Sequence, residues 1–349
     1  MKVVTVVGAR PQFVKAAAVS PVLRRHAREV LVHTGQHYDY EMSAALFDDL
    51  RLPSPDVNLG VGSGSHAAQT AAMLAGIADV LASETPDWLV VYGDTNSTLA
   101  GALAAAKLDI RVAHVEAGLR SFDRKMPEEI NRVVTDHLST LLLCPSVTAA
   151  DNLRAEGIER GVAVVGDVMA DVLRSVLPGL NGSSAVLRRF ALDARAFVVL
   201  TIHRAHTADD PVALNQVLDA MGRLEMPVLF PIHPRTRRLL DDGSVTVPCN
   251  VAVSEPLSYR DMIAAVRASR ALVTDSGGLQ KEAYWLGVPC VTVRDATEWT
   301  ETLAHGWNIL TGTDSDRIVA AIRRDVPAHR PPLYGDGAAA ERCVAELLK

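Results

Sequence analysis

The chain has few aromatic residues, few cysteines and no long apolar run. Aromatic side chains make up 5% of its 349 residues. The longest apolar runs, WLVVY (88–92) and RAFVVLTIH (195–203), have the length of strands, whereas a membrane-spanning helix needs about 20 apolar residues. The N-terminal MKVVTVVG is typical of a short strand and not of a signal peptide. The sequence therefore predicts a soluble protein without a membrane partner.

Cysteine is equally scarce and is not arranged to bind metal. Cys144, Cys249, Cys290 and Cys343 lie far apart, with no CxxC pair. Scattered thiols of this kind are typical of a reduced, cytoplasmic protein. HExxH and Asp-rich motifs are absent too, so no metal site is expected.

Positive charge is not in excess. Lys and Arg number 35 against 41 Asp and Glu, a formal net charge of −6. No stripe of basic residues interleaved with aromatics occurs, so a nucleic-acid partner is not expected. The sequence also lacks GxGxxG and GxxxxGK[ST], which excludes the usual dinucleotide-binding and P-loop sites.

What the chain does have is a regular alternation of short β-branched runs with longer helical patterns. This alternation favours an α/β fold with parallel sheets buried on both faces. A chain of 349 residues is long for one core, so two domains are expected. We place them at 1–166 and 167–335, with a last helix, about 336–349, that can return to the first domain.

In doubly wound sheets, ligands bind at the carboxyl ends of the strands. After the first strand, the segment GARPQFVK (8–15) places Arg10 in a loop and Lys15 in the first turns of a helix. Two cations beside a helix N-terminus suit a phosphate or diphosphate. Surface ion pairs are the alternative explanation for these two residues alone.

Three carboxylates follow strands or open a helix in the first half. Asp94 follows the buried run WLVVY, Glu116 ends the run RVAHV, and Glu128 opens a helix in which Arg132 can pair with it. Taken singly, each is more typical of a turn, a cap or a dipole partner. On one sheet edge, however, clustered carboxylates raise one another's pKa and are suited to moving protons.

The second half places histidines at strand ends. His203 ends RAFVVLTIH, and PIHPRTRR (231–238) puts His233 at another strand end. The loop SEPLSYRDM (254–262) holds Met262. A single histidine is more often structural than catalytic, and only the repeated placement at strand ends favours a site.

The segment LVTDSGGLQKEA (272–283) leads from a strand directly into a helix. Ser276, Gly277 and Gly278 stand at the helix N-terminus, which favours negative charge and close approach of a ligand to the backbone. Glu282, six residues after Ser276, can accept two ribose hydroxyls while the helix start holds a phosphate.

These motifs together, in the order GxRPxxxK, TGQH, GDTxS, HVEAGLR, PEEINR, HR, EPLxY and TDSGGxQKEA, resemble the non-hydrolysing UDP-N-acetylglucosamine 2-epimerases. The resemblance spans Gly8 to about Gly312. It implies a GT-B-like fold of two Rossmann-like domains facing a central cleft, a homodimer, and no cofactor. It also implies elimination of UDP to a 2-acetamidoglycal and re-addition of UDP with inversion at C2.

The resemblance assigns roles to the candidate residues. Asp94, Glu116, Glu128 and His203 would be catalytic. The substrate and its UDP would be bound by a larger set: Arg10, Lys15, Arg132, His233, Met262, Ser276, Gly277, Gly278 and Glu282.

Some positions depart from the common pattern of the family. Gln12 replaces a usual Glu, residues 203–207 read HRAHT instead of HRREN, and Trp299 stands where many members have Arg-Pro. Several variants resemble the branch that epimerises UDP-2,3-diacetamido-2,3-dideoxy-glucuronate. Without a glutamate at position 12, a carboxylate on the substrate would also be repelled by one negative charge fewer. Plain UDP-GlcNAc is the first expectation and the diacetamido uronate the second.

Other functions stay open at this stage. A hydrolysing 2-epimerase would let water trap the glycal, and a GT-B glycosyltransferase would use the same fold. A sugar-nucleotide sensor without activity is a further possibility, although it would have no need for Asp94, Glu116, Glu128 and His203 together.

Overall fold

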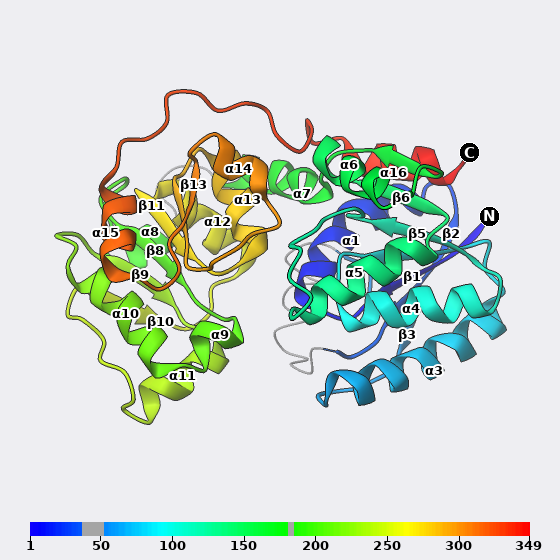
Figure 1. Cartoon of the computed structure of the whole chain (residues 1–349), viewed down its shortest axis with the longest axis horizontal. Coiled ribbons are helices and arrows are strands. Elements are labelled where there is room, and N and C mark those ends of the chain that lie inside the picture. The colour runs from blue at the N-terminus through cyan, green and yellow to red at the C-terminus, as the bar shows by residue number, and fades with distance from the viewer. Residues whose placement is uncertain (37–51, 181–184) are drawn as a thin grey trace. The chain divides into compact units, whose positions relative to one another are not determined.

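The structure is a computed structural model that describes residues 1–36, 52–180 and 185–349. It divides into two compact units, Met1–Ser175 with Pro332–Lys349, and Val176–Pro331 (Figure 1). The division falls after Ser175, beyond the change near 166 expected from the sequence. The reason is that helix α7 (Val168–Val176) is held in the first unit, where the Asp171 carboxylate accepts the N–H groups of Ala339 and Ala340.

The first unit contains a parallel sheet with the strand order β3-β2-β1-β4-β5-β6-β7 in the described residues. Its strands are rich in Val and Leu because both faces are covered. Their bounds are β1 Lys2–Val7, β2 Arg28–His33, β3 Val57–Asn58, β4 Trp88–Tyr92, β5 Arg111–Val115, β6 Leu141–Cys144 and β7 Val162–Val164.

Helices connect these strands, and the C-terminal helix packs against the first one. Thr95 and Ser146 cap α4 and α6 through hydroxyls that accept backbone N–H groups, as expected of N-cap residues. The helices of this unit, besides α7, are α1 Arg10–Leu23, α3 His66–Glu84, α4 Asn96–Lys107, α5 Pro127–Leu138, α6 Val147–Ala155 and α16 Ala339–Leu347.

The second unit repeats this plan with the strand order β10-β9-β8-β11-β12-β13, again parallel. The strands are β8 Val198–Thr201, β9 Val228–Pro231, β10 Val251–Ser254, β11 Ala271–Thr274, β12 Cys290–Thr292 and β13 Asn308–Leu310. The helices are α8 Ala185–Arg189, α9 Ala205–Ala208, α10 Pro211–Gly222, α11 Pro234–Asp241, α12 Tyr259–Ala268, α13 Gly277–Leu286, α14 Thr300–Ala304 and α15 Ser315–Arg323, and a single 3-10 turn spans Leu177–Gly179.

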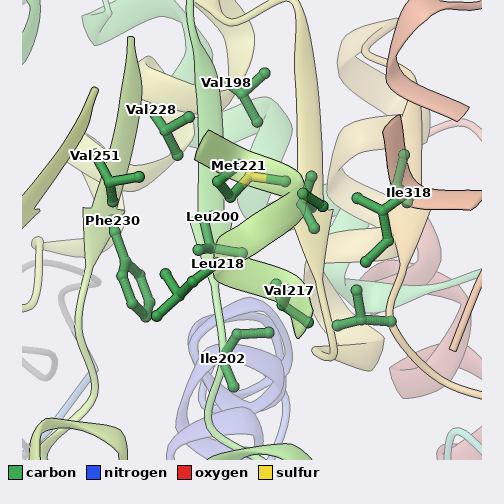
Figure 2. Close-up of a cluster of buried hydrophobic side chains, with 14 of the residues drawn as sticks. Val198, Leu200, Ile202, Val217, Leu218, Met221, Val228, Phe230, Val251 and Ile318 are labelled. Atoms are coloured by element: carbon green, nitrogen blue, oxygen red, sulfur yellow. The ribbon is translucent and has the colours of Figure 1, made fainter. Parts of the chain in front are cut away.

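Two apolar clusters fill the second unit, one on each face of its sheet. Figure 2 shows the larger cluster, in which Leu200 of β8, Leu218 of α10 and Ile318 of α15 are fully buried. Alternate residues of β8 point to opposite faces, so Val199 belongs to the other cluster, with Phe197 and Leu272. The sheet is thus buried on both sides, and its polar groups are confined to the strand ends.

Each sheet reverses its strand order between two neighbouring strands, β1 and β4 in the first unit and β8 and β11 in the second. In doubly wound sheets the loops after two such strands leave in opposite directions, and ligands bind at this edge. Arg10 and Lys15 follow β1, Asp94 follows β4, His203 follows β8 and the candidates from Ser276 to Glu282 follow β11, whereas the other candidates follow other strands of the same sheets. No helix in the described part of the chain is long and apolar enough to span a membrane.

Candidate active site

The loop after β1 is fixed by Gln12. Its Oε1 accepts the backbone N–H groups of Gly8 (2.8 Å) and Ala9 (3.1 Å), and its Nε2 donates to Tyr92 O and Thr98 Oγ1 (both 3.0 Å). The side chain is 1% exposed. The amide therefore joins the α1 loop to the end of β4, and position 12 carries no charge.

A buried ion pair lies beside this loop. Lys15 Nζ is 2.5 Å from Glu116 Oε1, and both side chains are buried. Glu116 has φ +72°, a conformation that costs a non-glycine residue energy and is found most often at functional sites. A Cβ on Gly93 would lie 2.8 Å from Lys15 Nζ, so only glycine leaves room for the pair.

Asp94 and Arg132 form a second ion pair. Asp94 Oδ2 accepts from Arg132 Nη2, and Arg132 Nη1 is 2.7 Å from Glu129 Oε2. Asn131 Nδ2 donates to the Asp94 carbonyl at 2.9 Å. The sequence suggested Glu128 as the partner of Arg132, but Asp94 and Glu129 hold the guanidinium. The reason is that Glu129 faces the core, where it also accepts the N–H of Ser121 and Phe122.

Two further candidates of this unit lie at helix starts. Arg10 is the first residue of α1 and is exposed, and Glu128 lies half-buried in the first turn of α5. Of the three carboxylates, Asp94 pairs with Arg132 and Glu116 pairs with Lys15. His37 of the TGQH motif lies outside the described residues.

Sequence reasoning missed His114, which lies on β5 and is fully buried. Its Nδ1 is 2.7 Å from Asp136 Oδ1, and its Nε2 is 2.7 Å from the carbonyl of Gly93. The signal was present in HVEAGLR, the motif that also contains Glu116, but a histidine inside an apolar strand is usually structural.

In the second unit, Asp275 orients His203. Its buried carboxylate accepts the backbone N–H of His203 (2.9 Å) and of Arg204 (2.8 Å), and lies 2.8 Å from His203 Nδ1. Burial alone would raise the pKa of Asp275, but the histidine and these N–H groups outweigh it and lower the pKa. The His203 side chain stays 41% exposed, with the ring held by Nδ1. Sequence reasoning missed Asp275, although it precedes Ser276.

His233 lies near His203, with ring centroids 6.0 Å apart. Its Nδ1 accepts the N–H of Arg235, so it caps α11. This bond leaves Nε2 as the protonated nitrogen when the ring is neutral. The sequence placed both histidines at strand ends, and the structure brings them together.

The Asp-Ser-Gly-Gly turn opens α13. Ser276 is the N-cap, and its Oγ accepts the N–H of Leu279 at 3.5 Å. Gly277 and Gly278 form the first turn and present backbone N–H groups at the positive end of the helix dipole. A Cβ on Gly277 would lie 2.6 Å from Glu298 Oε1, so a carboxylate already adjoins this helix start.

Two cations neutralise that carboxylate in part. Arg294 Nη2 lies 3.1 Å and Arg204 Nη2 3.9 Å from Glu298. Lys281 Nζ lies over the ring of the neighbouring Trp299, 3.6 Å from a ring centroid. Trp299 thus binds a buried cation through its π face.

Glu282 and Met262 lie further into the same unit. Glu282 Oε1 accepts the Tyr259 hydroxyl at 2.8 Å, and both side chains are buried. Met262 is half-buried on α12 and packs against the apolar cluster. The structure therefore gives Glu282 a polar partner and Met262 an apolar setting.

The arrangement gives each unit its own edge site. The first unit holds Arg10, Lys15, Asp94, Glu116, Glu128 and Arg132; the second holds His203, His233, Met262, Ser276, Gly277, Gly278 and Glu282. Among the residues that the structure describes, no group of three or more His, Cys, Asp or Glu side chains is placed to hold a metal ion.

Comparison with known proteins gives consistent matches. A family model described as UDP-N-acetylglucosamine 2-epimerase matches residues 22–348. A Methanococcus maripaludis protein named UDP-N-acetylglucosamine 2-epimerase homolog is 47% identical over 99% of both chains. A Pseudomonas aeruginosa protein named UDP-2,3-diacetamido-2,3-dideoxy-D-glucuronate 2-epimerase is 44% identical over 100% of both chains.

Solved structures agree on the fold. The crystal structure of Methanocaldococcus jannaschii UDP-GlcNAc 2-epimerase in complex with UDP-GlcNAc and UDP matches with a TM-score of 0.92 and 38% identity, over 100% of this chain and 99% of that one. This confirms the predicted fold class, an α/β chain of two Rossmann-like units of the GT-B-like kind.

Proposed function

The chain belongs to the UDP-N-acetylglucosamine 2-epimerase family, and we propose that it interconverts UDP-GlcNAc and UDP-ManNAc without hydrolysis. The observation that carries the proposal is the pairing of two carboxylates with two cations at one sheet edge, Glu116 with Lys15 and Asp94 with Arg132. Such an edge supplies both groups that exchange protons and charges that stabilise an anionic leaving group.

The reaction has two halves. One carboxylate removes the proton from C2 while the C1–O bond to UDP breaks, which gives a 2-acetamidoglycal and UDP. UDP then adds back to C1, and C2 receives a proton on the opposite face. Asp94, Glu116 and Glu128 are the proposed proton-transfer groups, and Arg10 and Lys15 stabilise the departing diphosphate.

The second unit is proposed to hold the nucleotide. The first turn of α13, from Ser276 to Gly278, would bind the diphosphate through backbone N–H groups. Glu282 would accept the ribose hydroxyls. His203, held by Asp275, would be a catalytic residue. His233, Met262 and, from the first unit, Arg132 complete the set of proposed substrate contacts.

A second substrate is supported by a specific observation. A relative named for UDP-2,3-diacetamido-2,3-dideoxy-D-glucuronate is 44% identical over the whole chain, and two relatives named UDP-N-acetylglucosamine 2-epimerase are each 40% identical. The reaction at C2 is the same for both sugars. The alternative therefore concerns the groups at C3 and C6 and leaves the proposed chemistry unchanged.

One experiment separates these substrates. The purified protein is incubated with UDP-GlcNAc in D₂O while NMR follows the C2 and anomeric protons. Deuterium at C2 together with UDP-ManNAc supports the proposal. Free ManNAc and UDP would show a hydrolysing enzyme instead. Exchange with the diacetamido uronate alone would make that sugar nucleotide the substrate in place of UDP-GlcNAc. No exchange with either sugar, while UDP still binds, would contradict an epimerase.

Three further expectations belong to the same proposal. The protein acts as a homodimer, works in the cytoplasm, and supplies a precursor of surface polysaccharide. Light scattering of the purified chain tests the first, with one mass of two chains as the expected result. The resemblance to the family supports each of these three expectations.

A further inference from the structure

His114 occupies an unusual position for a buried histidine, because both of its ring nitrogens face oxygen atoms that accept hydrogen bonds. Nδ1 lies 2.7 Å from Asp136 Oδ1 and Nε2 lies 2.7 Å from the Gly93 carbonyl. A carbonyl oxygen only accepts, so Nε2 must donate to Gly93. Whether Nδ1 is protonated then depends on whether Asp136 is ionised.

Asp136 is held as a carboxylate. Its Oδ2 accepts from Arg120 Nη1 (2.7 Å) and from the N–H of Gly118 (3.1 Å). Burial would raise the pKa of Asp136, but His114 and Arg120 outweigh burial and lower it. An ionised carboxylate also only accepts, so both ring nitrogens of His114 face acceptors.

The charges around His114 balance. Arg120 also forms a two-pronged ion pair with Glu156, at 2.7 Å from each carboxylate oxygen. His114 and Arg120 supply two positive charges, and Asp136 and Glu156 supply two negative ones. Glu156 reaches solvent, with 28% of its side chain exposed, so the fully buried charges of this cluster are those of His114, Arg120 and Asp136.

His114 contacts Gly93, which lies beside the Lys15–Glu116 pair in the first-unit site. The Gly93 N–H donates to Val115 O at 3.0 Å, so β5 holds both polar groups of Gly93. Gly93 has φ +61°, and a Cβ there would lie 2.8 Å from Lys15 Nζ and 3.5 Å from Glu116 Oε1. Asp94 follows directly. A shift of Gly93 would therefore move Asp94 and crowd the Lys15–Glu116 pair.

We propose that His114 is a positioning residue, a doubly protonated imidazolium that fixes the Gly93–Asp94 turn against the Lys15–Glu116 pair. The role rests on the proposed 2-epimerase function, which it deepens. His114 does not touch the substrate. It acts through the Gly93 carbonyl, and Asp136, Arg120 and Glu156 keep it charged and oriented.

The protonation state is tested directly by ¹⁵N NMR of the histidine rings at neutral pH. The His114 signals are assigned by their loss in His114→Gln, with His137→Gln, an exposed histidine of α5, as the matched control. Two protonated ring nitrogens on His114 are the expected result. One protonated and one unprotonated nitrogen would overturn the inference. This measurement does not depend on any activity.

The positioning role is tested with two amide variants that each keep one of the two contacts. His114→Gln places an amide N–H where Nε2 lies and can still donate to Gly93, whereas His114→Asn reaches only as far as Nδ1 and Asp136. We expect His114→Asn to lower kcat for C2 exchange about 100-fold with KM within about threefold, because small displacements of reacting groups cost about that much. His114→Gln should keep roughly ten times the kcat of His114→Asn.

The outcomes also distinguish this inference from the proposed function. Equal loss of kcat in the two variants, or a loss that follows Tm alone, would overturn the positioning role. An inactive wild type with either sugar would contradict the proposed function, while the NMR result still decides the charge of His114.

Discussion

The two units share a strand order but differ in what lies at the carboxyl edge of their sheets. In the first unit the edge residues are held by ion pairs, Lys15 with Glu116 and Asp94 with Arg132. In the second, the edge consists of a capped helix start at Ser276 and an exposed His203 ring. One topology thus supports two kinds of chemistry.

The two sheet edges differ in which groups supply their charge. Side chains of the first unit supply full charges that a change of protonation can switch, which suits proton transfer. At Ser276 to Gly278 the second unit adds backbone N–H groups and a helix dipole, which do not titrate and suit the binding of an anion. We therefore expect substitutions of the carboxylates of the first unit to affect mainly kcat, and substitutions at the start of α13 to affect mainly nucleotide affinity.

The largest effect is expected at the carboxylates of the first unit. Glu116→Gln and Asp94→Asn should each lower kcat for C2 exchange by about 10² to 10⁴, the usual contribution of acid–base catalysis. UDP affinity, measured by calorimetry, should change little. Asp151→Asn, an exposed carboxylate paired with Arg154, is the matched control and should be without effect.

Removal of one partner of a buried pair also destabilises a protein, by roughly 3–5 kcal/mol. Tm is therefore measured for both variants, and activity is assayed well below it. If folded Glu116→Gln kept full exchange activity, the assignment of proton transfer to this edge would be wrong.

The next largest effect is expected at Asp275. Asp275→Asn removes the charged partner of His203 Nδ1 and lets the ring turn, a loss of about 1.5–3 kcal/mol, or roughly 10- to 100-fold. Steady-state kinetics should show this loss in kcat/KM. Asp209→Asn, an exposed carboxylate paired with Arg235, is the control in the same unit. An unchanged kcat/KM would remove His203 from the proposed site.

The sequence predicts the fold better than the partners within the site. Alternating β-branched runs and helical patterns indicate parallel sheets because each run is short and apolar, and the strand ends place Asp94, Glu116 and His203 at the edges. Which charges pair depends on side-chain packing across elements far apart in sequence. The link between Lys15 and Glu116, 101 residues apart, has no local signal.

Helix spacing alone was also misleading in one place. The four-residue spacing from Glu128 to Arg132 favours an ion pair on an exposed helix, yet Arg132 is buried and pairs with Asp94 and Glu129. Burial decided the partner there. His114 and Asp275 were missed for a related reason, because their importance depends on contacts made across elements.

A smaller effect concerns stability in acid. Asp136 in the first unit and Asp275 in the second both have a lowered pKa in the folded protein, relative to the ordinary 3.8. The stability that they contribute is therefore present above about pH 4 and is lost as the pH falls through the folded pKa. Each unit of lowering corresponds to about 1.4 kcal/mol.

Thermal unfolding between pH 6 and pH 2 checks this prediction. Tm should fall steeply below about pH 4 in the wild type and less steeply in Asp136→Asn and Asp275→Asn. A wild-type Tm that stays level down to pH 2 would contradict it. If only one of the two variants flattened the profile, the acid sensitivity would lie in that unit alone.

The smallest effect compares two caps in equivalent places, since α4 follows β4 and α13 follows β11. Thr95 and Ser276 each accept a backbone N–H in the first turn, so Thr95→Ala and Ser276→Ala should each cost about 1 kcal/mol of stability. Only Ser276→Ala should also weaken UDP binding, because α13 is the helix proposed to hold the diphosphate. Chemical denaturation and calorimetry measure the two quantities separately. Equal weakening of UDP binding by both variants would contradict the assignment of the diphosphate to α13.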